Sequence, residues 1–210
     1  HGWDVTVYCR NPGQHLRSYQ GTRLVNLPAL RLKAAETLSH TALSTGHAVF
    51  GHFDVAIVFN SGNAPFVRPL QWRGVPVAVH VDGLEAQRAK WEGFGAKYYA
   101  WAERTSVRHA DAIIADAYGI ADHIKRTYGR GSVYLPYGAP LTDPPAARLA
   151  ELGLAEQRYH LTVARFEPEN HVLEIVRGYR RSTARLPLIV IGAASYSHDY
   201  SDAVARAAGG

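Results

Sequence analysis

The sequence contains no methionine, not even at position 1, and only one cysteine, Cys9. A single cysteine excludes a disulfide framework within the chain and a zinc site built from several thiolates. No apolar run approaches the roughly 18 residues that cross a membrane, and no charged-then-apolar secretory signal is present. These absences indicate a reducing, cytoplasmic compartment. The missing methionine predicts that the sequence is part of a longer chain.

Long blocks of one charge are absent as well. The 23 Lys and Arg residues exceed the 18 Asp and Glu residues, but both kinds are spread along the chain. This balance favours an anionic partner, such as a phosphorylated ligand or an acidic membrane, or it only keeps the protein soluble. The lack of a Lys/Arg block argues against nucleic acid. Peripheral membrane association stays open, because residues 88–109 interleave basic and aromatic residues; the alternative is that these aromatic side chains pack inward.

Several motifs of known chemistry are missing. The eleven histidines show no zincin spacing, so no metal site is predicted. The chain has no GxSxG elbow, no Walker loop and no GxGxxG fingerprint. The last absence argues against nicotinamide chemistry, unless a preceding segment carries that fingerprint.

What the chain does contain is an alternation of short apolar segments with longer amphipathic ones. Most apolar segments are continuous runs rich in β-branched residues, as expected for strands covered on both faces. This alternation predicts an α/β fold with doubly wound parallel sheets. Strands are expected at Asp4–Tyr8, Thr22–Asn26, Asp54–Phe59, Val75–His80, Ala112–Ala115, Val133–Leu135, His160–Ala164 and Leu188–Ile191, and helices at about Leu32–Ala48, Leu84–Val107, Tyr118–Tyr128, Val172–Ser182 and Tyr200–Ala208.

A proline-rich segment divides the chain. Pro136, Pro140, Pro144 and Pro145 fall within ten residues, which excludes a continuous helix or a central strand there. We therefore predict a first domain over residues 1–136, a linker over 137–156 and a second domain over 157–210. The second domain is expected to be incomplete, because roughly 55 residues bury too little surface to be stable alone.

Polar residues follow three of the predicted strands, at the edge where open parallel sheets bind ligands. The third strand runs into the sequence NSGNAP. Gly62 would allow a ligand to approach the backbone, and Asn60 and Asn63 could bind sugar-type hydroxyls. The competing interpretation is a strand-to-helix turn with Pro65 at the first helical position.

The fourth strand ends in HVDGLE, which places His80 at its end. A histidine there could act as a base or orient a substrate, or it could be a structural residue. Asp82 and Glu85 have the spacing of a helix-capping box, which is their competing interpretation. Capping explains these two acidic residues but not His80.

The first strand of the second domain runs into RFEPEN, where Arg165 has no apolar role. An arginine in this place could hold a phosphate through two parallel hydrogen bonds. The alternative is a surface ion pair with Glu167 or Glu169.

Five segments in order along the chain carry a resemblance to a known family: GWDVTVYCR, VHVDGLEAQRAKW, HADAIIAD, YLPYGAP and VARFEPENH. They resemble the retaining glycosyltransferases of the GT-B class, in the family 4-like group that includes bacterial rhamnosyltransferases and other polysaccharide-assembly enzymes. HADAIIAD followed by YLPYG and a new domain is typical of the class. VARFEPEN and VDGLE are similar to the rhamnosyltransferase-like branch.

The resemblance implies two Rossmann-like domains facing across a cleft. The first would bind the acceptor and the second a nucleoside-diphosphate sugar, with no metal and no cofactor beyond that donor. The family's first strand and glycine-rich loop would precede His1, and the distal half of the donor domain would follow Gly210.

The resemblance also assigns roles to residues. Arg165 matches the arginine that grips the donor diphosphate; the lysine that usually follows it is absent from EPENH, so Arg165 would carry more of the binding. His80 matches a position near the reacting sugar, where close relatives often have Asn, and Ala86 replaces an aromatic residue of the family. The remaining implied residues are Asn170 and Gly192 on the donor side, and Asn60, Gly62, Asn63, Asp82 and Glu85 on the acceptor side.

The implied enzyme moves a hexose or a rhamnose-like deoxyhexose from the nucleotide sugar to a saccharide or lipid-linked acceptor, with retention of configuration. Arg165 would stabilise the leaving diphosphate, and His80 would position the sugar or the acceptor hydroxyl. A sugar-nucleotide epimerase of the same fold and a non-catalytic nucleotide-sugar-binding module are the alternatives. The sequence does not specify the nucleobase, the sugar, the acceptor or the oligomeric state.

Overall fold

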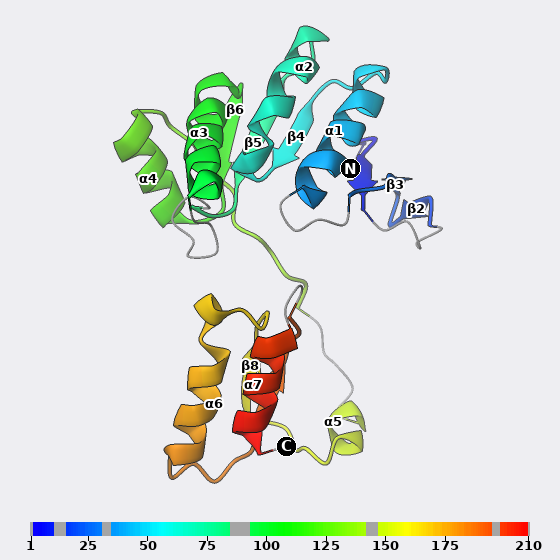
Figure 1. Ribbon diagram of the computed structural model, residues 1–210. Coiled ribbons are helices and arrows are strands. Elements are labelled where there is room, and N and C mark those ends of the chain that lie inside the picture. Colours follow the sequence, from blue (N-terminus) through cyan, green and yellow to red (C-terminus); the bar gives the residue numbers. More distant parts are fainter. Residues whose placement is uncertain are drawn as a thin grey trace. The chain divides into compact units, whose positions relative to one another are not determined.

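The computed structural model describes residues 2–10, 16–30, 35–84, 93–141, 147–194 and 198–209. The chain divides into two compact units, His1–Gly138 and Ala139–Gly210 (Figure 1). Each unit has its own hydrophobic core, so each is described by itself.

Unit 1 contains a parallel sheet of four strands in chain order: β4 (Ala56–Phe59), β5 (Val77–Val81), β6 (Ala112–Ala115) and β7 (Val133–Tyr134). A second sheet has the order β1-β3-β2, built from β1 (Thr6–Cys9), β2 (Ser18–Tyr19) and β3 (Thr22–Asn26). β1 and β3 are parallel, whereas β2 and β3 form an antiparallel pair. Neighbouring strands of the four-stranded sheet are all parallel, so each connection between them is a crossover that runs through helical segments.

The helices of unit 1 are α1 (Glu36–Val49), the 3-10 segment η1 (Ser61–Phe66), α2 (Val67–Trp72), α3 (Phe94–His109) and α4 (Tyr118–Tyr128). The four α-helices lie in a row along the sheet (Figure 1). The core forms where they cover β5, whose Val77, Val79 and Val81 are buried with Val67 and Ile124. α4 ends at Gly129, whose φ of 68° suits glycine and lets its N–H bond the Lys125 carbonyl.

Unit 2 contains α5 (Ala147–Glu151), β8 (His160–Val163), η3 (Pro168–Asn170), α6 (Val172–Arg181), β9 (Leu188–Ile191) and α7 (His198–Ala208). β8 and β9 pair in parallel, and α6 is the crossover between them. Val172 and Val176 of α6 and Val204 of α7 are the buried centre, with Phe166, Leu188 and other half-buried residues around it.

The structure confirms the predicted α/β class, with parallel strands alternating with helices. Every predicted strand is present, five of them with ends shifted by two residues or fewer, and α4 has the predicted bounds. The sequence did not predict β2, α2 and α5, and α5 lies inside the segment predicted as a linker. α3 begins at Phe94 rather than at Leu84, and residues 85–92 lie outside the described residues.

Cover on both sheet faces, which the continuous apolar runs predicted, is found within the described residues mainly at β5 and β6. Alternate residues of the outer strands are exposed: Ile57 and Phe59 in β4 are 53% and 55% exposed, and Leu161 and Val163 in β8 are 53% and 68% exposed. Continuous apolar composition was therefore a poor guide to two-sided burial, because β-branched residues also suit half-covered strands.

The HADAIIAD motif has its first acidic residue, Asp111, at the amino end of β6. The Asp111 carboxylate accepts a hydrogen bond from the Val77 backbone N–H at 2.7 Å and another from Gln71 Nε2 at 2.8 Å. Gln71 Nε2 also donates to the His109 carbonyl at 2.8 Å. These bonds tie α2, α3 and the starts of β5 and β6 together, so Asp111 has a structural role.

The same bonds predict a pH-dependent stability. The hydrogen bond from Gln71, followed by that from Val77, lowers the pKa of Asp111 below its ordinary value of 3.8. Stability from Asp111 is then fully present above that ordinary value and is lost as the pH falls through the lower folded pKa. We expect Asp111→Ala to cost about 1 kcal/mol at neutral pH. In thermal melts, the difference in stability between wild type and the variant should shrink as the pH falls below the ordinary value of 3.8; a difference that is constant with pH would contradict this account.

A buried polar network joins α3 to α4. Glu103 is only 5% exposed, and its Oε1 accepts a hydrogen bond from the Tyr128 hydroxyl at 2.7 Å and bonds His123 Nε2 at 2.9 Å. Burial, together with the bond to Glu103, raises the pKa of Tyr128 far above its ordinary value. The phenol therefore stays protonated and satisfies the buried carboxylate, as a buried charge requires.

Candidate functional site

The carboxyl ends of β4, β5 and β6 meet at one edge of the four-stranded sheet. In the register, Phe59 of β4 lies beside His80 of β5, and His80 lies beside Ile114 of β6. The residues that follow each strand therefore gather along this edge, which is where open parallel sheets bind their ligands. Asn60, Asp82 and Asp116 are the polar residues that leave β4, β5 and β6.

His80 is held between two aromatic rings. Its ring centroid lies 5.1 Å from that of Phe59 and 5.3 Å from that of Tyr137. The residue is 5% exposed, and in the described part of the chain its Nδ1 has no hydrogen-bond partner. A buried polar atom without a partner costs free energy unless something else satisfies it, so it marks a place where a ligand or water can bind. The arrangement fixes the ring and suits positioning.

Asp116 and Tyr137 are functional candidates that the sequence reading did not name. Oδ1 of Asp116 is buried and, within the described residues, also lacks a hydrogen-bond partner. Partial shielding of the phenol from water, and then the charges of Asp82 and Asp116, raise the pKa of Tyr137 above its ordinary value of 10.0. Tyr137 is 67% exposed and keeps its proton at neutral pH, so its hydroxyl can donate a hydrogen bond to a ligand oxygen. Two carboxylates, a phenol and an imidazole are thus neighbours at this edge.

A second aromatic pair comes from the start of α4 and the end of β7. The rings of Tyr118 and Tyr134 are stacked, with centroids 4.2 Å apart and an angle of 18° between their planes. Tyr118 is 70% exposed and Tyr134 is 38% exposed. Exposed flat rings of this kind can pack against the apolar face of a sugar or another ring.

The NSGNAP loop is built mainly by its own hydrogen bonds. The Asn60 side chain accepts from the Gly62 N–H at 2.8 Å, and the Asn63 side chain donates to the Phe59 carbonyl at 2.8 Å. A Cβ on Gly62 would lie 2.7 Å from the Tyr99 ring, and the Gly62 carbonyl accepts from the Tyr98 hydroxyl at 2.6 Å. Gly62 therefore allows α3 to approach closely, which favours the strand-to-helix turn, although Pro65 lies inside η1 and not at its first position. Ligand binding by these three residues stays a prediction.

Of the two acidic residues predicted to bind the acceptor after β5, only Asp82 lies within the described residues. Asp82 is exposed and its charge acts on Tyr137. Glu85 lies outside the described residues, so neither its acceptor role nor the capping box can be placed. α3 begins later, at Phe94, after Gly93 in a left-handed conformation with φ of 58°.

The predicted donor residues meet at the carboxyl edge of β8 and β9. Arg165 follows β8 and is exposed. Nδ2 of Asn170 donates to the Arg165 carbonyl at 2.8 Å, which fixes the loop rather than leaving this amide group for a ligand. Gly192 follows β9, and a Cβ there would overlap the Ala164 carbonyl and lie 2.8 Å from the Phe166 ring. Gly192 is thus needed to bring the ends of β8 and β9 together next to Ala164 and Phe166.

Of the two residues that were not predicted, the sequence pattern could have indicated Asp116 but not Tyr137. Asp116 follows a buried strand just as Asp82 does, so the rule applied to β4, β5 and β8 would also have found it at β6. Tyr137 gave no such signal, because it lies in the proline-rich segment that was predicted to be a linker.

The described residues contain no cluster of three or more His, Cys, Asp or Glu side chains able to hold a metal ion. They also include no helix long and apolar enough to cross a bilayer.

Comparisons with known proteins bear on this edge. The family model described as "Glycosyl transferase 4-like domain" matches residues 1–138, which hold the whole of the site in unit 1. No curated protein matches the chain.

Two solved structures are similar to the chain. The structure of UGT89C1 from Arabidopsis thaliana complexed with UDP-L-rhamnose aligns with a TM-score of 0.53 at 12% identity, over 90% of this chain and 57% of that one. A UDP-glucosyltransferase from Polygonum tinctorium, capable of glucosylating indoxyl, aligns at 12% identity over 82% of this chain and 53% of that one, and its TM-score of 0.43 is too low to support an argument. The first likeness shows the fold alone. The chain spans little more than half the length of either protein.

Proposed function

The chain belongs to the glycosyl transferase 4-like domain family, and from this premise we propose that it moves a hexose or a rhamnose-like deoxyhexose from a nucleoside-diphosphate sugar to a saccharide or lipid-linked acceptor, with retention of configuration. The first unit binds the acceptor and the second binds the donor. The resemblance of VDGLE and VARFEPEN to the rhamnosyltransferase-like branch supports a deoxyhexose. The similar fold of a protein solved with UDP-L-rhamnose agrees with a nucleotide-sugar donor.

One observation carries the acceptor half of this proposal. At the carboxyl edge of unit 1, two buried polar atoms, Nδ1 of His80 and Oδ1 of Asp116, lack partners within the described residues. The protonated Tyr137 hydroxyl and the stacked pair Tyr118 and Tyr134 lie on elements that end or begin at the same edge. Hydrogen-bonding groups combined with flat rings match a carbohydrate, whose hydroxyls need partners and whose ring faces are apolar.

The donor half depends on charge. When the glycosidic bond to the nucleotide breaks, negative charge develops on the leaving diphosphate, and positive groups fixed near it lower the barrier. Arg165 leaves the carboxyl end of β8, and α6 begins a few residues later, so its amino end adds a favourable dipole at the same edge. No lysine follows in EPENH. Within this chain, Arg165 is therefore the residue proposed to hold the diphosphate.

The two alternatives predict different products. The purified protein is incubated with UDP-, dTDP- and GDP-sugars, with and without a saccharide acceptor, and products are identified by mass spectrometry and by the anomeric coupling in NMR spectra. The proposal expects a new glycoside with retained configuration only when acceptor is present. A changed nucleotide sugar without acceptor would indicate an epimerase, and binding without any turnover would indicate a binding module.

His80 provides a test of positioning against proton transfer. Because its ring is buried between Phe59 and Tyr137, we expect His80→Asn to keep a polar group in place and to lower kcat/KM by less than about tenfold. His52→Asn, at an exposed histidine outside the site, is the matched control. A loss of about 10³-fold or more in steady-state assays of well-folded His80→Asn would assign the histidine to acid-base catalysis instead.

A further inference from the structure

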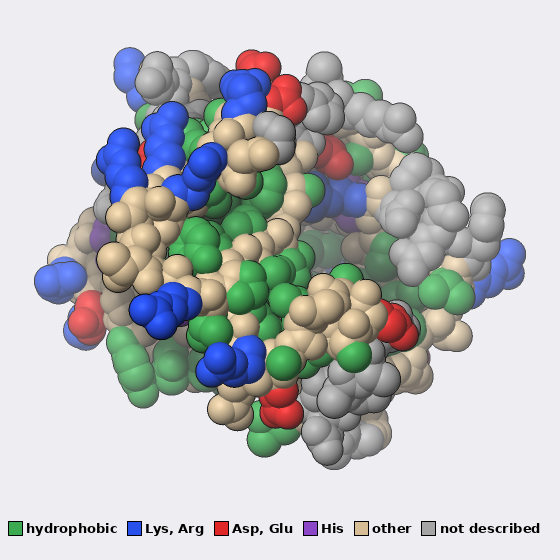
Figure 2. Space-filling model, turned by 90° about the horizontal axis from the view of Figure 1, so that it is seen from below, with side chains coloured by type: hydrophobic (Ala, Val, Ile, Leu, Met, Phe, Trp, Pro, Cys, Tyr) green, Lys and Arg blue, Asp and Glu red, His purple; other side chains and the backbone are tan. Residues whose placement is uncertain are grey.

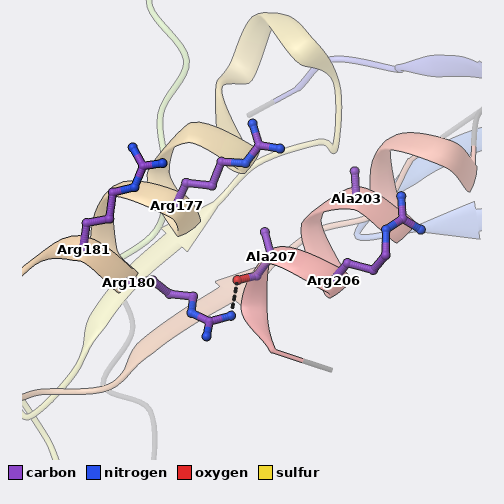
Figure 3. A pocket seen from close by; sticks show the side chains of 6 residues that line it. All are labelled: Arg177, Arg180, Arg181, Ala203, Arg206 and Ala207. Carbon is purple, nitrogen blue, oxygen red and sulfur yellow. Dashed lines mark hydrogen bonds between the residues drawn. The ribbon is translucent and has the colours of Figure 1, made fainter.

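The second unit carries a cationic groove between α6 and α7. It has a volume of about 560 Å³ and is lined by Arg177, Arg180 and Arg181 from α6 and by Ala203, Arg206 and Ala207 from α7. Figure 3 shows the arginines projecting from both helices around the small alanine side chains. Alanine at positions 203 and 207 leaves the space that the longer side chains surround.

The groove is distant from the proposed donor edge. α6 starts after the carboxyl end of β8 and runs back to the amino end of β9, because it connects two parallel strands. Its last turns, which carry the arginines, therefore lie at the opposite end of the sheet from Arg165. A role for this groove in holding the donor diphosphate is excluded by that placement.

The residues that line the groove include four arginines and no Asp or Glu. Asp202 lies one turn before Arg206 in α7, so the three arginines of α6 carry most of the excess positive charge. The ion pairs of Glu103 with His123 and of Glu174 with His171 do not include an arginine of the groove. Lys and Arg side chains also gather toward one side of the face drawn in Figure 2. Several exposed cations held together repel one another, and an anion between them removes that repulsion.

Stabilisation of helix ends explains only part of this cluster. Nη1 of Arg180 donates to the Ala207 carbonyl at 3.0 Å, which satisfies the carboxyl end of α7 (Figure 3). Arg181 and Arg206 also lie in last turns, where a cation is favourable. Arg177 lies one turn earlier in α6 and lines the same groove, so favourable interaction with a helix dipole does not explain its presence there.

We propose that this groove binds the phosphate groups of an acidic phospholipid surface and so holds the second unit against a membrane. Guanidinium groups match phosphate oxygens through paired hydrogen bonds. All four arginines are exposed, so a single free phosphate in the groove would be screened by water and held weakly. A lipid surface presents many phosphates at once and adds its own negative potential, which draws basic clusters. The apolar face of α6 is buried on the sheet, so attachment is electrostatic, without insertion.

The test is co-sedimentation of the whole chain with vesicles of phosphatidylcholine alone and of phosphatidylcholine with phosphatidylglycerol. The variant Arg177→Gln/Arg181→Gln/Arg206→Gln leaves Arg180 in place as the cap of α7. The control Arg108→Gln/Lys125→Gln/Arg126→Gln removes three exposed charges from α3 and α4 in the other unit. Circular dichroism melts verify that both variants fold, and calorimetric titration with inorganic phosphate and pyrophosphate tests soluble anions.

We expect wild type and control to bind only the acidic vesicles, with binding that weakens as salt rises. The groove variant should bind roughly one hundredfold more weakly, since each arginine near an anionic surface contributes about a factor of five. No binding of wild type to acidic vesicles would overturn the proposal. Equal losses in the two variants would indicate a general charge effect or a surface on α3 and α4 and would also overturn it. Tight pyrophosphate binding without vesicle binding would assign the groove to a soluble ligand.

Discussion

Replacing Arg165 with alanine is expected to lower kcat/KM for glycosyl transfer by roughly 10²–10³-fold, which corresponds to about 3–4 kcal/mol of lost transition-state stabilisation. The expectation follows from the place of Arg165 at the carboxyl end of β8, beside the amino end of α6, with no lysine following in EPENH. Most of the loss should appear in kcat, because the negative charge on the diphosphate grows as the bond to the sugar breaks. Steady-state kinetics with varied nucleotide sugar separate kcat from KM.

The matched control for this prediction is Arg158→Ala. Arg158 is an exposed arginine of the same unit, but it precedes β8 and so lies at the opposite end of that strand. Its removal changes the net charge by the same amount and should leave kcat/KM within about twofold, as for a surface charge away from the site. Unchanged activity in Arg165→Ala, or equal losses in the two variants, would remove Arg165 from the mechanism.

The second large effect is on stability. We expect Gly192→Ala to destabilise unit 2 by about 3 kcal/mol, because a Cβ at this position overlaps the Ala164 carbonyl and presses on the Phe166 ring. The backbone oxygen cannot move without breaking the pairing at the ends of β8 and β9, where the Phe166 N–H bonds the Ala193 carbonyl at 2.9 Å. Hydrogen exchange of the β8 and β9 amides measures the loss within unit 2 alone.

Gly178→Ala is the control and has the opposite expected sign. Gly178 lies within α6, is exposed, and has open space around the position of a new Cβ. Alanine in an exposed helix interior is more favourable than glycine by about 1 kcal/mol. Faster exchange in Gly192→Ala together with slower exchange in Gly178→Ala would support the structure, whereas equal behaviour of the two variants would show that Gly192 is not closely packed.

Composition and spacing were enough to predict most of the elements and the edge where the site lies. Strands such as Thr22–Asn26 and Ala112–Ala115 were predicted with their observed ends, because runs of β-branched and small apolar residues bounded by polar ones leave few alternatives. The order of residues along the chain also indicated which polar residues lie at or just after the strand ends. His80 and Arg165 were identified as candidate site residues in this way. Their location at the carboxyl edges of two sheets follows directly from parallel pairing.

The contacts that these residues make depend on how distant segments pack together. The burial of His80 between Phe59 and Tyr137 depends on a ring that comes 57 residues later in the chain. The two acidic residues of HADAIIAD look equivalent in sequence, yet Asp111 ties strand starts together and Asp116 faces the candidate site. The arginine groove forms only where α6 and α7 pack together. Side-chain surroundings of this kind arise from contacts between distant segments, which periodicity and spacing along one chain do not encode.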